Sequence, residues 1–164
     1  MLETNNDALY VFSHFLDHFY KGGVGIRQIC DWCRLLWTHR TLLDYGLLES
    51  QIKRMGLISE WKAFGAFAVE YLGMPADAMP LYDNNKKWNR KAFLIKKFIL
   101  MSGNFGHNRD MDYYGKYPYI IRKAISLRRR ICDLFQHARI FPIDSLRFLP
   151  NLFFYGLKSA IRGE

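Results

Sequence analysis

The sequence is poor in the features that mark secreted and membrane-spanning proteins. Its three cysteines are an odd number and too few for a disulfide scaffold. No apolar run reaches the ~18 to 20 residues that a membrane-spanning helix needs. The polar, acidic start over residues 1–7 lacks the composition of a signal peptide. These absences predict a cytoplasmic protein without a transmembrane segment.

The sequence also shows little sign of β-structure, because its β-branched content is low and apolar residues do not alternate with polar ones. Apolar residues recur instead at helical spacing. With 164 residues, half of them hydrophobic, the chain can bury a real core. We therefore expect an all-α fold, a single domain over residues 1–164 with six to seven helices and no sheet.

The spacing of the apolar residues predicts a series of helices along the chain. The last of them lies beyond residue 139 and is kinked or broken at Pro150. Thr41, Ser59 and Asn89 are the expected N-caps of the third, fourth and fifth helices. Loops are expected near residues 74–89 and 103–118. The expected helices are 5–20, 26–37, 42–55, 60–72, 90–102 and 119–139.

The helix that begins at Ile26 is the expected centre of the fold, because its apolar stripe is wide enough to pack on more than one side. Further apolar faces are expected to point inward from the other helices. The stripe of this helix is Ile26, Ile29, Cys30, Cys33, Leu36 and Trp37. The expected inward residues elsewhere are Leu9, Phe12, Leu16, Phe19, Trp61, Phe64, Ala68, Tyr71, Leu94, Phe98, Met101, Ile121, Ala124, Leu127, Ile131, Leu134 and Ala138.

Negative charge is scarce in the second half of the chain. Residues 84–164 carry 17 Lys and Arg against 5 Asp and Glu, whereas residues 1–83 carry 7 against 10. Such a basic half favours an anionic partner, namely nucleic acid, nucleotide phosphates, a membrane surface or an acidic domain; a solvated basic face is the alternative. The candidate basic surface comprises Lys86, Lys87, Arg90, Lys96, Lys97, Arg129 and Arg130.

Known catalytic and metal-binding motifs are missing too, including the phosphate-binding glycine loops and H-E-x-x-H. Cys30 and Cys33 form a lone C-x-x-C pair, and without a second pair we expect buried packing and no metal site. His14 and His18 lie four residues apart and could bind a metal, but the sequence favours half-buried histidines with hydrogen bonds.

Two other groups of residues could contact a ligand. Arg27 and Asp31 follow a glycine-rich turn, where they either form an ion pair along the helix, with Arg34, or face a phosphate or carboxylate. Of the two groups, the loop over 103–116 is the stronger candidate for a ligand-binding site. Its acidic pair could ligate Mg²⁺ and its arginine could hold a phosphate, or the loop is merely polar. The candidates in this loop are His107, Asn108, Arg109, Asp110 and Asp112.

Several segments resemble the carboxy-terminal helical part of a family of uncharacterised bacterial nucleotidyltransferases, in particular its Bacteroides-type members. The resemblance runs through nearly the whole chain, and the stretches that carry it are residues 8–19, 25–32, 103–110 and 140–145. In that family a histidine-containing helix precedes one with an Arg…Asp pair, as at Arg27 and Asp31. The resemblance implies, for the complete protein, a polymerase-β-like catalytic domain that binds Mg²⁺ and a nucleoside triphosphate through Gly-Ser and D-x-D, with a helical domain beside the acceptor substrate.

This chain has no Gly-Ser before a D-x-D, and its D-x-D at Asp110 and Asp112 falls in a loop between helices. The resemblance therefore implies a helical accessory or substrate-side domain that needs no cofactor of its own and has a separate or lost catalytic domain as its partner. Whether the chain is an enzyme stays open. The alternative is a basic helical module that binds nucleic acid or another protein. A third possibility is a peripheral membrane protein that uses residues 142–164.

Overall fold

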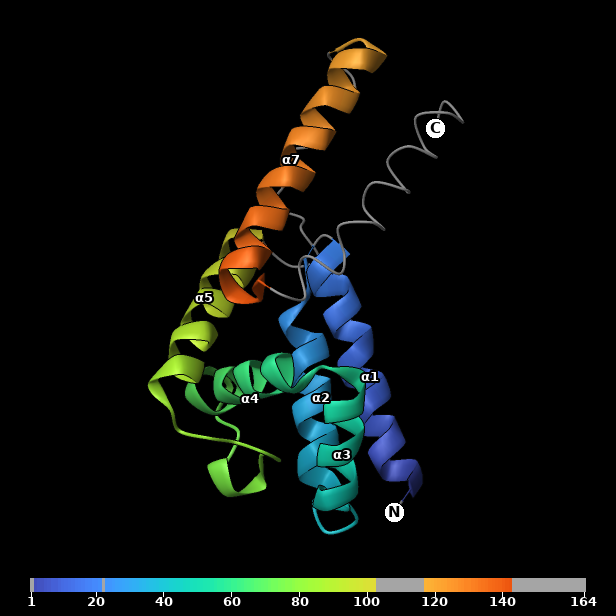
Figure 1. Ribbon diagram of the computed structural model, residues 1–164, viewed down its shortest axis with the longest axis vertical. Helices are drawn as coiled ribbons and strands as arrows, with labels where there is room; N and C mark the ends of the chain where they lie inside the picture. The colour runs from blue at the N-terminus through green and yellow to red at the C-terminus, as the bar shows by residue number, and fades with distance from the viewer. Residues whose placement is uncertain (1, 22, 103–116, 143–164) are drawn as a thin grey trace. The chain divides into compact units, whose positions relative to one another are not determined.

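The computed structural model describes residues 2–21, 23–102 and 117–142. Helices dominate these ranges and no strand occurs in them, so the all-α prediction is confirmed (Figure 1). The chain forms two compact units, Met1–Asn108 and Arg109–Glu164. The elements are α1 (Leu2–Lys21), α2 (Ile26–Thr38), α3 (Tyr45–Met55), α4 (Ile58–Leu72), the 3-10 helix η1 (Ala76–Ala78), α5 (Lys86–Ser102) and α7 (Tyr119–Ile140).

An aromatic cluster forms the core of the first unit. Phe12 on α1 lies against Trp32 of α2 and Trp61 of α4, with ring centroids 5.2 and 4.7 Å apart. Trp32 and Trp61 meet edge to face at 4.9 Å. None of the three side chains is exposed to solvent. Edge contacts of this kind add to the free energy gained from burial, so the cluster ties α1, α2 and α4 together.

The centre of this unit is α4 rather than α2, which corrects the expectation from the sequence. Helix α4 contacts α2, α3 and α5, and Figure 1 shows it crossing the α1–α2–α3 group. Residues 60–68 of α4 are all buried except Lys62. A helix that is apolar on nearly every side is buried on nearly every side. On α2, by contrast, Ile26, Cys30 and Trp37 are exposed, because only one face of that helix is covered.

Three predicted helix starts were wrong. Asp44, not Thr41, caps α3, and its Oδ1 accepts from the Leu47 backbone N–H at 2.9 Å. Helix α4 begins at Ile58, so Ser59 lies inside it. Helix α5 begins at Lys86 and not Arg90, because the Asn85 side chain accepts from the Lys87 backbone N–H at 3.0 Å. That bond does the capping that the sequence had assigned to Asn89.

The predicted ends of α3 and α4 are confirmed. Gly56 and Gly73 follow the two helices with φ of 73° and 77°, a left-handed conformation that glycine adopts without strain. The predicted inward residues of α1 are also confirmed, since all four are buried. Exceptions on α4 and α5 are Tyr71 and Met101, which are 38% and 59% exposed. The buried residues of α1 are Leu9, Phe12, Leu16 and Phe19.

Helix α7 belongs to the second unit and departs most from expectation. Its apolar stripe was predicted to point inward, but Ile121, Leu127 and Ile131 are 44%, 58% and 45% exposed, and Ala124 is also exposed. No helix in the described ranges is both long enough and apolar enough to cross a membrane.

Candidate functional site

Helix α5 gathers five of the seven basic residues that the sequence singled out. Its 17 residues include no Asp or Glu. The start of the helix at Lys86 places the lysines before Arg90 on the same helix as those after it. The five are Lys86, Lys87, Arg90, Lys96 and Lys97.

Three of these cations share one line on the outside of α5. Lys86, Arg90 and Lys97 are four and seven residues apart, which puts them on one side of a helix over about 16 Å. All three are exposed and have no ion-pair partner among the described residues. Phe93 lies on the same line between Arg90 and Lys97 and is 54% exposed. We call these four residues the basic face of α5.

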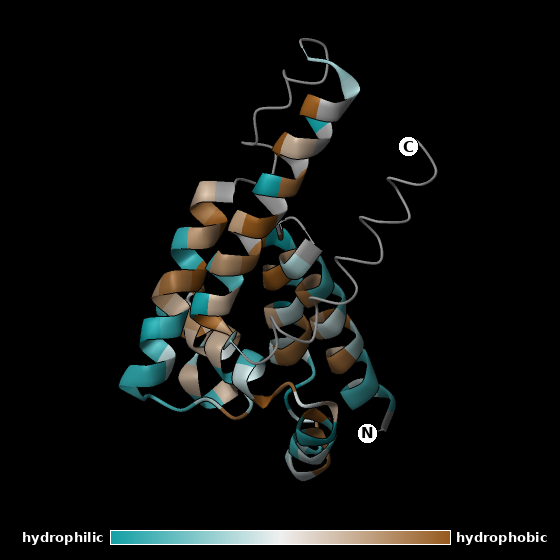
Figure 2. Cartoon of the chain, turned by 45° about the horizontal axis from the view of Figure 1, so that its top comes forward, coloured by the Kyte–Doolittle hydropathy of each residue, from teal (hydrophilic) through white to brown (hydrophobic). Residues whose placement is uncertain are grey.

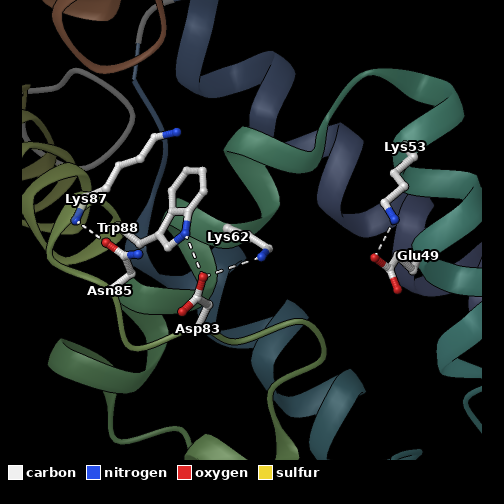
Figure 3. A network of polar contacts seen from close by, with 7 residues as sticks. All are labelled: Glu49, Lys53, Lys62, Asp83, Asn85, Lys87 and Trp88. Atoms are coloured by element: carbon white, nitrogen blue, oxygen red, sulfur yellow. Dashed lines mark hydrogen bonds and ion pairs between the residues drawn. The ribbon is translucent and has the colours of Figure 1, made fainter.

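Lys87 belongs to a second cluster, built around Trp88 (Figure 3). The Trp88 Nε1–H donates to Asp83 Oδ2 at 3.3 Å, and the same carboxylate lies 3.6 Å from Lys62 Nζ. The ammonium groups of Lys87 and Lys62 are 4.5 and 5.9 Å from the centre of the Trp88 ring. Asp83 forms an ion pair with Lys62, whereas Lys87 has no ion-pair partner among the described residues, so the positive charge at the start of α5 is only partly balanced.

This positive charge lies where a helix tolerates it least. Lys86 and Lys87 occupy the first turn of α5, which contains no acidic residue. The exposed N–H groups there already carry a partial positive charge, so cations in the first turn destabilise the helix. Residues that break a local rule of stability without an evident structural gain often serve a function.

Lys96 and Lys91 differ from the outward cations because each has a partner within the first unit. The Lys96 ammonium lies 4.4 Å from the centre of the Tyr71 ring. Lys91 Nζ donates to Ser59 Oγ at 2.8 Å. Both lysines are half-buried and fasten α5 to α4. The predicted basic run thus divides into cations that hold α5 in place and cations that face solvent.

On α2, Arg27, Asp31 and Arg34 are all exposed. No ion pair joins them in the part of the chain that the structure describes. The ion pair, one of the two alternatives that the sequence offered for these residues, is therefore absent, and the two predicted site residues Arg27 and Asp31 face solvent one helical turn apart.

Only one of the two cysteines of the C-x-x-C pair is buried as predicted. Cys33 is buried, and burial raises the pKa of its thiol to about 12. Cys30 lies about one turn before it on α2 and is exposed. A buried thiol with a raised pKa is a poor nucleophile and a poor metal ligand. Cys33 thus serves packing, as predicted, while the prediction for Cys30 was wrong.

The histidine pair on α1 shows ring contacts. The rings of His14 and His18 meet edge to face at 4.8 Å, and Tyr10 stacks on His14 at 6.2 Å. Among the described residues no three His, Cys, Asp or Glu side chains gather in a way that could hold a metal ion.

The remaining candidates lie outside what the structure describes. They are His107, Asn108, Arg109, Asp110 and Asp112 in the predicted loop. Arg129 and Arg130 fall on α7, but their side chains are not among those described.

Sequence reasoning missed one residue of the basic face, Phe93. The signal was present, because Phe93 follows Arg90 by three residues and precedes Lys97 by four, which places it on their line. The sequence alone assigned Phe93 neither to the site nor to the inward face of the helix, which was expected to carry Leu94, Phe98 and Met101.

Comparison of the chain with protein-family models, curated proteins and solved structures found no match. The resemblance to nucleotidyltransferases is therefore still a hypothesis.

Proposed function

We propose that the chain is a non-catalytic helical module that binds single-stranded nucleic acid through the basic face of α5. The observation that carries the proposal is the line of three exposed cations, Lys86, Arg90 and Lys97, with an exposed aromatic ring among them. Proteins bind single strands by combining phosphate contacts from cations with aromatic rings on which bases stack.

The dimensions of the face fit such a strand. Its length of about 16 Å matches roughly five nucleotides at the rise of about 3.4 Å per nucleotide in one strand of a duplex. Lys87 and Lys62, beside Trp88, extend the positive charge past the first turn of α5. The described residues of α5 present no acidic side chain that would repel the phosphates.

Fluorescence anisotropy with a labelled single-stranded oligonucleotide of about 10 nucleotides tests this proposal at low salt. We expect the triple variant Lys86→Ala/Arg90→Ala/Lys97→Ala to bind at least about tenfold more weakly than the wild type, for both RNA and DNA. The control variant Arg34→Ala/Arg40→Ala/Arg54→Ala removes three exposed cations from α2, the turn after it and α3, and so matches the change in net charge. Equal binding by the two variants would contradict the proposal.

A second candidate function is that of accessory domain beside a nucleotidyltransferase-like catalytic domain. One observation favours it, since Arg27 and Asp31, which carry the resemblance on α2, are exposed without an ion pair in the described part of the chain. In that case the chain alone transfers no nucleotide. Incorporation of label from a nucleoside triphosphate in the presence of Mg²⁺, abolished in Asp110→Ala/Asp112→Ala, would overturn both candidates, because each describes a non-catalytic chain.

A further inference from the structure

Helix α7 carries a row of large apolar side chains that are exposed to solvent, unlike the basic face of α5. Leu127, Ile131 and Phe135 follow one another at four-residue spacing and are 58%, 45% and 68% exposed. Ile121, at 44%, extends the same side toward the start of the helix. Figure 2 shows hydrophobic and hydrophilic residues interspersed along this helix. An exposed apolar stripe of this length marks an interaction surface.

The charge on α7 restricts what can cover this stripe. The helix contains six Lys and Arg and a single acidic residue, Asp133. Arg128 and Arg139 are exposed, and helical spacing places both beside Phe135 on the stripe's own side. The partner must therefore offer apolar material and negative charge on the same side.

We propose that α7 docks on an anionic lipid surface and lies in its interface. Interfacial helices of this type carry large apolar side chains on one face and an excess of Lys and Arg, and they are only weakly apolar as a whole. Leu127, Ile131 and Phe135 enter the boundary between headgroups and acyl chains. Arg128 and Arg139 extend their guanidinium groups to the lipid phosphates while their methylene stems stay among the apolar groups.

A second copy of α7 is a poorer occupant of this stripe. Arg128 falls between Ala124 and Ile131 at the spacing of a coiled-coil seam, so pairing two copies would bury an arginine from each. It would also bring together two helices with an excess of five positive charges each. An anionic membrane contributes the opposite charge, worth roughly fivefold in binding for each basic residue near its surface.

Flotation of the full chain with lipid vesicles tests this inference. We expect the chain to float with vesicles that contain phosphatidylserine and much less with phosphatidylcholine alone. Leu127→Ser/Phe135→Ser should lose roughly tenfold or more in binding for each side chain removed. Arg128→Gln/Arg139→Gln should lose roughly thirtyfold on the anionic vesicles only. Tyr10→Ser is the matched control, since it removes a similarly exposed aromatic side chain from α1 and should float as the wild type does.

Three outcomes would overturn the proposal: no flotation with phosphatidylserine vesicles, equal flotation of wild type and Leu127→Ser/Phe135→Ser, or equal flotation on neutral and anionic vesicles. Sedimentation velocity tests the alternative that a second copy of the chain covers the stripe. A dimer of the wild type that Leu127→Ser/Phe135→Ser abolishes would assign the stripe to a second copy. Because all four substituted positions are exposed, circular dichroism should show wild-type helicity for both double variants. None of these outcomes depends on the basic face of α5.

Discussion

The side chain of Asn5 and the backbone of Asp44 form a reciprocal pair of hydrogen bonds. Asn5 Nδ2 donates to the Asp44 carbonyl at 2.9 Å, and the Asp44 N–H donates to Asn5 Oδ1 at 3.2 Å. Asn5 is fully buried although it lies in the first turns of α1. Asp44 in turn caps α3, so the amide of Asn5 fixes the point at which α3 begins.

We expect Asn5→Ala to lower the free energy of unfolding by about 1 to 3 kcal/mol, because it leaves the Asp44 N–H without its acceptor, whereas the Asp44 carbonyl still accepts from the Leu48 N–H. Asn6→Ala is the control. Asn6 is exposed and accepts one hydrogen bond, from Gln51 Nε2 at 3.2 Å, so its loss should cost less than about 0.5 kcal/mol. Urea unfolding of the two variants measures the difference, and equal values would contradict the assignment.

Cys33 should make the protein less stable at high pH. Its folded-state pKa is raised to about 12 from an ordinary value of 9.0, first by burial and second by the neighbouring Cys30. The stability that this shift represents is present in full below pH 9 and is lost as the pH rises toward 12, since the unfolded thiol ionises first. Over that window the loss approaches about 1.4 kcal/mol per pH unit.

Unfolding at several alkaline pH values isolates the contribution of Cys33. Other groups titrate in the same range, so the informative quantity is the difference in slope between the wild type and Cys33→Ala. Cys30→Ala removes an exposed thiol and should keep most of the wild-type slope, because burial is the larger cause of the shift. Identical slopes for the wild type and Cys33→Ala would contradict the assigned pKa.

The sequence predicted well where the reason for a structure is local. Helical spacing identified the buried residues of α1, and glycines identified the ends of α3 and α4. It failed where a distant contact decides. The start of α3, for example, lies at Asp44, whose backbone is bonded by the side chain of Asn5, a residue far away in the sequence. The exposed stripe of α7 has ordinary amphipathic spacing, and spacing alone does not tell whether a stripe faces a core or a partner.

The sequence predicted only part of the candidate site, because the rest depends on contacts between helices. Composition located the basic residues, but their division into outward and packing cations depends on Tyr71 and Ser59 of α4, to which Lys96 and Lys91 point. The sequence also treated Phe93 as no part of a site. A ring on the outside of a helix is visible only once the inner face has been fixed by the residues packed against it, here by α4.

Charge reversal at Lys86 should separate function from stability. Lys86→Glu places a carboxylate in the first turn of α5, so it should raise the free energy of unfolding by about 0.3 to 1 kcal/mol while weakening oligonucleotide binding. Lys97→Glu makes the same change of charge in the interior of the helix and should weaken binding without stabilising the protein. If Lys86→Glu left binding intact, the first turn of α5 would not contact the strand.

The ring of Phe93 should contribute by stacking rather than by charge. We expect Phe93→Ala to weaken oligonucleotide binding by about 1 to 3 kcal/mol and to leave its salt dependence unchanged. Leu100→Ala is the matched control, because Leu100 is an exposed non-aromatic residue of the same helix. A similar loss in both variants, measured by anisotropy, would indicate a general apolar contact instead of base stacking.

The salt dependence of oligonucleotide binding shows whether the three exposed cations of α5 contact phosphates. Each phosphate neutralised in a single strand contributes about 0.7 to the slope of the logarithm of the binding constant against the logarithm of the salt concentration. If Lys86, Arg90 and Lys97 each contact a phosphate, the slope of Lys86→Ala/Arg90→Ala/Lys97→Ala should be shallower than that of the wild type by about 2. An unchanged slope, or no binding by the wild type at low salt, would contradict the proposal that this face of α5 binds nucleic acid.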